Sequence, residues 1–263
     1  MSTVNRMQAR VERLVPVTVA CIGAILAVQA VSRDIRVLGP VVALAILVVL
    51  PAAVGRWRMR RLLRSGDVQR VIGTWEGSIR RLPHRDTMAP LLRATAYASY
   101  GWIEAARHAL ERAVRGPAWD AALEQRLFIE TLLDTFEGDR QEAVRKAAVI
   151  EALPAPSGSV WARRRVVLLR QGLGALARAF AHTSQATDAR LLVRAAAASP
   201  LVHWAMRYAA AVVALDHGRA RDVESLLAGA PPWPEESAFH TYHDELMAHA
   251  AAFSSGASAP GAC

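Results

Sequence analysis

A cluster of histidines and carboxylates near the carboxyl end contains residue types that could bind a metal ion. In the run FHTYHDELMAH, His240 and Asp244 are four residues apart, and His243 is one helical turn after His240. Side chains at these spacings share one face of a helix, and imidazole and carboxylate groups are zinc ligands. The HExxH pattern of zinc peptidases is absent, because Glu245 follows Asp244 and the next histidine comes six residues after His243. We expect a solvated helix face, and a cryptic metal-dependent enzyme is the alternative.

Other motifs that carry chemistry are missing from the sequence. It contains no GxGxxG fingerprint, no Walker loop and no GxSxG nucleophile elbow. No second set of metal ligands stands out elsewhere in the chain. We therefore predict a protein that is not an enzyme and that binds no metal or other cofactor.

Four arginines in the middle of the chain form a second local pattern. Arg163, Arg164 and Arg165 are consecutive, and Arg170 follows five residues later. Such a basic strip could meet an acidic partner or a membrane surface. The alternative is an ordinary solvated helix face.

Regularly spaced glycines divide the chain after residue 64 into helical units that would position these groups. Gly66, Gly101, Gly138, Gly172 and Gly218 lie 35, 37, 34 and 46 residues apart. Each glycine separates an apolar segment from a segment rich in small residues. No segment alternates between apolar and polar residues as a half-buried strand does, so the sequence predicts an all-α domain.

The unit Met88–Val114 resembles the tetratricopeptide repeat (TPR) family of helical hairpins. The matching residues are Ala94 and Tyr97 in the first helix, Gly101 at the turn, and Ala106, Leu110 and Ala113 in the second helix. Alanines at the contact allow two helices to cross closely. The resemblance covers roughly residues 60–235 and is looser outside this unit. It implies a TPR-like α-solenoid of about four to five helix pairs, and an irregular α-solenoid is the alternative.

The flanking units follow the same scheme less closely. Pro83 is expected to stop the second helix of the first unit, and Thr131 and Asp134 replace the small and aromatic residues of another. Trp161 and Gly172 are expected at the aromatic and turn positions of a further unit. Two breaks, 152–159 and 229–237, separate later units, and a closing helix is predicted at 239–253. These assignments predict a helical array over residues 65–253 and a disordered tail at 254–263.

The resemblance implies a binding surface, because repeats of this type take a peptide or a helix on the concave face of their first helices. That face is mostly apolar here, so we expect an amphipathic or apolar segment of a protein partner. The alternative is that the same residues are buried against neighbouring helices. The predicted partner-binding residues are Leu91, Thr95, Phe128, Leu132, Val166 and Leu169.

Two uncharged apolar runs precede the array. Residues 14–31 and 37–54 each contain eighteen residues, which as helices span roughly 27 Å, close to the thickness of a bilayer core. We predict a two-helix transmembrane hairpin within residues 1–64, and a buried hydrophobic hairpin in a soluble core is the alternative.

Arginines flank this predicted hairpin and indicate its orientation. Eight lie before the first run or after the second, and two lie in the loop between them. The positive-inside rule then places both termini in the cytoplasm, which predicts a multi-pass protein of the inner membrane. The residues predicted at the membrane interface are Arg56, Trp57, Arg58, Arg60, Arg61 and Arg64.

The net charge of +9 comes almost entirely from this first segment. Residues 1–64 contain ten arginines and two acidic residues, whereas the remaining residues contain 22 basic and 21 acidic side chains. A nearly neutral domain has little attraction for a phosphate backbone. We therefore predict no nucleic-acid partner.

Together these patterns predict a membrane-anchored TPR-like scaffold or assembly factor. It would bind a protein partner at the cytoplasmic face of the inner membrane and contact the lipid bilayer through its hairpin. Small residues in the two apolar runs could also let the membrane helices pair with another copy, so a homo-oligomer is possible. The sequence does not identify the partner.

Overall fold

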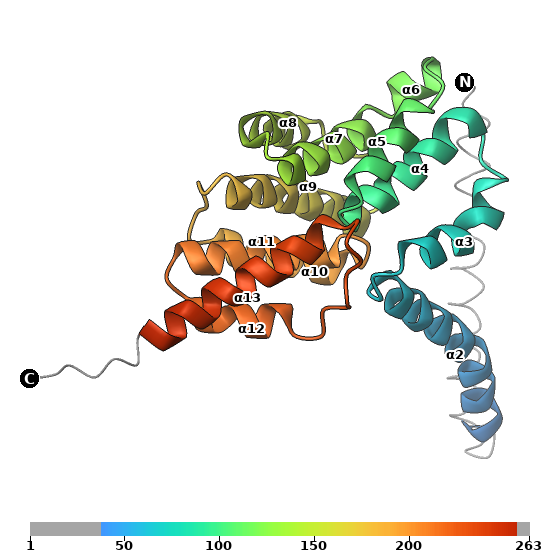
Figure 1. The fold of residues 1–263 in the computed structure, drawn as a ribbon. Coiled ribbons are helices and arrows are strands. Elements are labelled where there is room, and N and C mark those ends of the chain that lie inside the picture. Colours follow the sequence, from blue (N-terminus) through green and yellow to red (C-terminus); the bar gives the residue numbers. More distant parts are fainter. Residues whose placement is uncertain (1–37, 257–263) are drawn as a thin grey trace, which may run out of the picture. The chain divides into compact units, whose positions relative to one another are not determined.

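All elements in the described part of the chain are helices. The computed structural model describes residues 38–256, and the chain divides into two units, Met1–Met59 and Arg60–Cys263. No strand occurs among these described residues, which confirms the predicted all-α class (Figure 1). The helices are α2 (Leu38–Leu63), α3 (Val68–Ile79), α4 (Arg85–Ser99), α5 (Ile103–Glu111), α6 (Pro117–Ala121), α7 (Leu123–Glu137), α8 (Arg140–Ala152), α9 (Val160–Phe180), α10 (Asp188–Ala198), α11 (His203–Asp216), α12 (Ala220–Leu227) and α13 (Ala238–Gly256).

The predicted location in a membrane is wrong. Among the described residues, no helix is long and apolar enough to cross a bilayer. The predicted span 14–31 lies outside the described residues. The span 37–54 falls largely on α2, whose last eight residues include Arg56, Arg58, Arg60 and Arg61, and charges at this density are costly in hydrocarbon.

The residues predicted at a membrane interface therefore lose that role. Arg56, Trp57, Arg58, Arg60 and Arg61 are exposed on the second half of α2. Arg64 follows the helix, and its backbone oxygen accepts a hydrogen bond of 2.9 Å from the indole nitrogen of Trp204. This end of α2 thus contributes to the packing of the second unit.

Glycine turns join the helices into hairpins, as the spacing predicted. Gly101 lies between α4 and α5 with φ of 73°, and Gly138 lies between α7 and α8 with φ of 95°. This left-handed backbone is unfavourable for residues with a Cβ atom, so glycine is the usual residue at such a helix end. Gly66 and Gly218 adopt similar values at the ends of α2 and α11.

Gly172 does not form the turn that was predicted for it. It lies inside α9, which continues to Phe180, and the turn to α10 comes later with His182 at φ of 55°. A Cβ atom at position 172 would lie 2.7 Å from the Cβ atom of Ala195 on α10. The glycine therefore permits a close contact between two helices.

Substitution of Gly172 by alanine should lower the free energy of unfolding by about 1–3 kcal/mol, because the added methyl group overpacks the contact with α10. Gly73 provides the control, since it lies on exposed α3 and a Cβ there meets nothing within 4 Å. Gly73→Ala should stabilise the chain by up to about 1 kcal/mol through helix propensity. Chemical denaturation measures both values, and effects of the same sign would contradict this account of Gly172.

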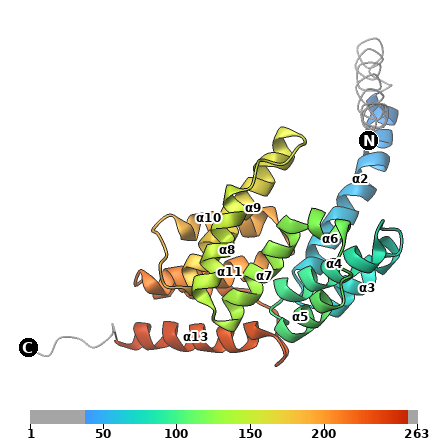
Figure 2. The same cartoon turned by 90° about the horizontal axis from the view of Figure 1, so that it is seen from above.

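The first helices of successive hairpins pack side by side. Contacts join α4 to α7, α7 to α9, and α9 to α11, while each second helix packs against its own first helix (Figure 2). This order of contacts is that of a helical repeat array. Membership of the TPR family stays a prediction.

One residue that departs from the repeat pattern is explained by an ion pair. Asp134 on α7 is buried, and its carboxylate lies 2.8 Å from the Nζ atom of Lys146 on α8. Glu130 and Glu142 also lie within 4 Å of this ammonium group. Burial alone would lower the pKa of Lys146, but the surrounding carboxylates outweigh it and raise that pKa.

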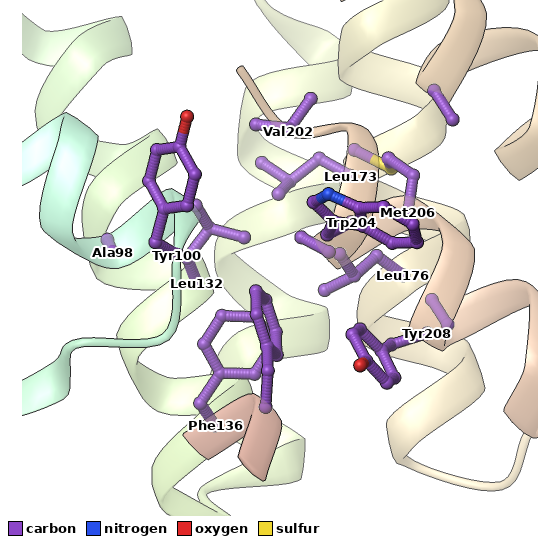
Figure 3. Close-up of a cluster of buried hydrophobic side chains, with 14 of the residues drawn as sticks. Ala98, Tyr100, Leu132, Phe136, Leu173, Leu176, Val202, Trp204, Met206 and Tyr208 are labelled. Atoms are coloured by element: carbon purple, nitrogen blue, oxygen red, sulfur yellow. The ribbon is translucent and has the colours of Figure 1, made fainter. Parts of the chain in front are cut away.

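Aromatic side chains from several helices fill the interior of the second unit. Figure 3 shows Tyr100, Phe136, Trp204 and Tyr208 directed toward a common core with Leu132. Tyr208 stacks on Phe239, and Phe136 and Trp204 make edge-to-face contacts with Phe239 and Trp233, which add to the stabilisation from burial. The core therefore draws on residues of α4, α7 and α11 and on the residue after α4.

The segment between α12 and α13 packs against distant turns. The Ser237 hydroxyl donates a 2.7 Å hydrogen bond to the backbone oxygen of Tyr100, and the Ala238 amide donates one of 2.8 Å to Gly101. A Cβ atom at Gly66 would come within 2.6 Å of Pro231. The segment predicted as a break before the closing helix is thus a structural part of the array.

Candidate functional site

The structure divides the six predicted partner-binding residues into two groups. Leu91 and Leu132 have no exposed surface, since both belong to the core. Thr95, Phe128, Val166 and Leu169 remain partly exposed on α4, α7 and α9. Only this second group can contact a partner directly.

The accessible group lies on three neighbouring first helices. Thr95 donates to the backbone oxygen of Leu91 and accepts a 3.0 Å hydrogen bond from the amide nitrogen of Gln125 on α7. Phe128 lies one turn after Gln125, and Val166 and Leu169 lie on adjacent α9. We refer to Thr95, Gln125, Phe128, Val166 and Leu169 as the first-helix row. Its apolar members and its two polar members could together bind an amphipathic segment.

Arg170 does not belong to the basic strip that was predicted with it. Its side chain is buried and forms a bidentate ion pair with Glu124 at 2.8 and 2.9 Å. It also donates to the backbone oxygens of Leu153 and Pro154. Arg170 thus fastens the loop after α8 to the start of α7, whereas Arg163–Arg165 remain exposed.

The predicted histidine face is only partly solvated. The Nδ1 atom of His243 lies 3.1 Å from the hydroxyl of Tyr208, which itself accepts a 2.7 Å hydrogen bond from Trp233. Asp244 is exposed. Within the part of the chain that the structure describes, no three histidine, cysteine, aspartate or glutamate side chains are placed to hold a metal ion. The metal-dependent alternative therefore gains no support.

A second histidine lies beside a pocket of about 420 Å³ lined by Phe180 and Leu246. The Nδ1 atom of His182 lies 2.9 Å from Asp216, and the Ser184 hydroxyl is 3.5 Å from the other oxygen of the same carboxylate. A nucleophile must contact its base. Between residues 38 and 256, no hydrogen bond joins Ser184 to His182, so the three groups do not form a catalytic triad.

A polar hollow of about 820 Å³ lies among α3, α4 and α5. Arg85, Arg93 and Arg112 line it together with Asp86. Arg93 is paired with Glu76 at 3.1 Å. The hollow mixes both charge signs and contains no arrangement of groups that indicates a reaction.

Comparisons with protein-family models, with curated proteins and with solved structures found no match for this chain.

Sequence reasoning missed one feature that bears on function, the exposed start of α9. Val160 and Trp161, at the start of α9, are highly exposed, and Trp161 retains 79% of its surface. Trp161 was expected at the aromatic position that packs between helices. The signal available was the break at 152–159 directly before it, since a residue at a helix start has fewer neighbours than one in its middle.

Proposed function

We propose that this chain is a helical-repeat scaffold that binds a protein partner along the first-helix row. The observation that supports the proposal is the partial exposure of Phe128 on α7 and of Leu169 on the adjacent helix α9, with Val166 one turn nearer the start of α9. Apolar side chains grouped on a surface and bordered by polar groups are typical of protein-binding sites. The partner would present an amphipathic segment, with its apolar residues against these three side chains.

The polar members of the row suit a binding role. The polar groups of the row, Thr95 and Gln125, already hydrogen-bond to each other. They would therefore border an apolar contact and orient the bound segment. The large aromatic of the row, Phe128, would contribute most of the binding energy.

Replacing Phe128 with arginine should abolish partner binding, because it places a charge in the apolar part of the row. Phe128 packs against the core on one side, but it is partly exposed, so we expect the guanidinium to reach solvent and the fold to remain intact. Ala148→Arg is the matched control, since Ala148 is exposed on α8, away from the row. In-cell crosslinking of the full-length chain with quantitative mass spectrometry compares the two variants with the unmodified protein. The partner identified in this way is then purified separately, and its binding to each variant gives a dissociation constant.

We expect one dominant crosslinked protein that Phe128→Arg loses and Ala148→Arg retains, with unchanged helicity by circular dichroism. Equal recovery from both variants would contradict the proposal. Loss of helicity in Phe128→Arg would assign the residue to the core. The smaller change Phe128→Ser would then repeat the binding test.

A further inference from the structure

The start of α9 projects beyond α7, α8 and α10, three of the four helices that pack against it. Glu124, the second residue of α7, pairs with Arg170, the eleventh residue of α9. Further along, Phe136 contacts Phe180 in an edge-to-face arrangement. The two helices are therefore parallel, and α9 begins about nine residues, or about 13 Å, before α7.

Two further neighbours of α9, helices α10 and α8, end near the level at which α7 begins. The contact between Gly172 and Ala195 lies three residues before the end of α10, and Glu151 meets Gly174 one residue before the end of α8. Residues 160–167 of α9 consequently lie beyond the body of these helices, as Figure 2 shows with the loop that precedes them.

This projecting end combines exposed apolar and cationic side chains. Val160, Trp161 and Val167 retain 52%, 79% and 38% of their surface. The guanidinium of Arg164 lies 5.9 Å from the centre of the Trp161 ring. Tryptophan and arginine are the residues most enriched where protein interfaces carry their binding energy.

Its charge has one sign. No aspartate or glutamate occurs from residue 152 to residue 187. Arg170 and Arg178, the other arginines of α9, are paired with Glu124 and Asp188. Arg163 and Arg165 form no ion pair with any residue of the described range 38–256.

We propose that the projecting end of α9 is a docking surface for an acidic amphipathic segment of a partner protein. Carboxylates of the partner would pair with Arg163 and Arg165, and an apolar side chain would pack on Trp161. The inference rests on the proposed function, since Val166 and Leu169 place the first-helix row on the same helix. The inference adds that the bound segment of the partner carries acidic side chains. A nucleic acid is disfavoured, because residues 65–263 contain 22 basic and 21 acidic side chains and are nearly neutral.

A designed peptide tests the charge preference directly. The probe is a fluorescein-labelled amphipathic peptide of about 20 residues, roughly 30 Å as a helix, with leucines on one face and glutamates on the other. A second peptide carries lysine in place of every glutamate. Fluorescence anisotropy measures the binding of both to the full-length chain from about 50 to about 200 mM salt.

We expect the acidic peptide to bind about tenfold more tightly than the basic one, with affinity falling as salt rises. The double change Arg163→Glu and Arg165→Glu should remove this preference, and Trp161→Ala should weaken binding of the acidic peptide. The matched control reverses Arg190 and Arg194, two exposed arginines on α10, and should retain the preference.

Three results would overturn the inference. They are equal binding of the two peptides, an equal loss in the control variant, and tighter binding of an oligonucleotide than of the acidic peptide. Phe128→Arg separates this inference from the proposed function. If that variant still binds the acidic peptide and still recovers the cellular partner, the first-helix row fails and the α9 surface stands. Conversely, Phe128→Arg could lose the cellular partner while the unmodified chain binds both peptides equally. That result would support binding along the first-helix row and contradict the α9 surface.

Discussion

Replacing Trp233 with alanine should lower the free energy of unfolding by about 3–5 kcal/mol. The indole is buried, and its N–H donates a 2.7 Å hydrogen bond to the hydroxyl of Tyr208. Its ring lies 5.0 Å from that of Phe239 and 6.4 Å from that of Tyr100. Truncation would leave a cavity among these rings and detach the segment between α12 and α13 from the array.

Trp161→Ala is the matched control for this measurement. It removes the same side chain from a site with 79% exposure, so its effect on unfolding should stay within about 0.5 kcal/mol. Chemical denaturation followed by circular dichroism compares the two variants. Similar losses in both, or a negligible loss in Trp233→Ala, would show that this segment does not hold the array together.

Acid should destabilise the chain through His203, the second prediction with a large effect. The imidazole is buried beside Trp204, and its Nδ1 atom lies 3.1 Å from the backbone oxygen of Ala196. Burial lowers the pKa of His203 from its ordinary 6.5 to about 4, and the nearby charges of Arg64 and Arg207 act in the same direction. The hydrogen bond that the imidazole donates to the backbone oxygen of Ala196 opposes this shift without cancelling it.

The direction of the pH effect follows from where the proton binds. Below pH 6.5 the unfolded chain takes up a proton at His203, whereas the folded chain does so only as the pH approaches 4. The folded state therefore loses stability as the pH falls through this range. Between neutral pH and pH 4 the loss from this one group amounts to about 3 kcal/mol.

The variant His203→Gln isolates the contribution of this imidazole. Near neutral pH it should be less stable than the unmodified chain, because glutamine does not reproduce the packing on Trp204. That difference should shrink by about 3 kcal/mol as the pH approaches 4. His108→Gln, at an exposed position on α5, controls for the loss of an imidazole and should follow the unmodified chain. Parallel pH curves for His203→Gln and the unmodified chain would contradict the prediction.

The hairpins could be predicted because their signals are local. Gly101 and Gly138 supply a backbone conformation that other residues disfavour, so their spacing indicated where helices turn. Gly172 shows the limit of that reasoning. A glycine that permits close packing of α9 on α10 is indistinguishable in the sequence from a glycine at a turn.

The candidate surface was predictable only in part for a related reason. Repeat positions selected residues on α4, α7 and α9, but Leu91 and Leu132 are fully buried there, whereas Phe128 is only partly buried. The segment between α12 and α13, which packs against the end of α4, comes from far along the chain. Ser237 in this segment hydrogen-bonds to Tyr100, 137 residues away. The periodicity of residues within one helix does not indicate which distant segment of the chain packs against that helix.

The apolar run of α2 was misassigned because the arginines after it were interpreted as the flank of a membrane span, whereas they belong to the same helix. Hydrophobicity over eighteen residues is compatible with a membrane span, but the helix of the folded chain continues into Arg56 and the arginines after it. No helix in the described range meets the requirements of a span.

Photocrosslinking from position 128 tests the central claim, partner binding along the first-helix row, most directly. A photoreactive phenylalanine analogue replaces Phe128 in one full-length sample and Ala148 in a second, and mass spectrometry identifies the attached segments after irradiation in cells. The proposed function predicts one protein attached through a single amphipathic segment from position 128, with no corresponding product from position 148. Equal products from both positions, or none from position 128, would contradict it.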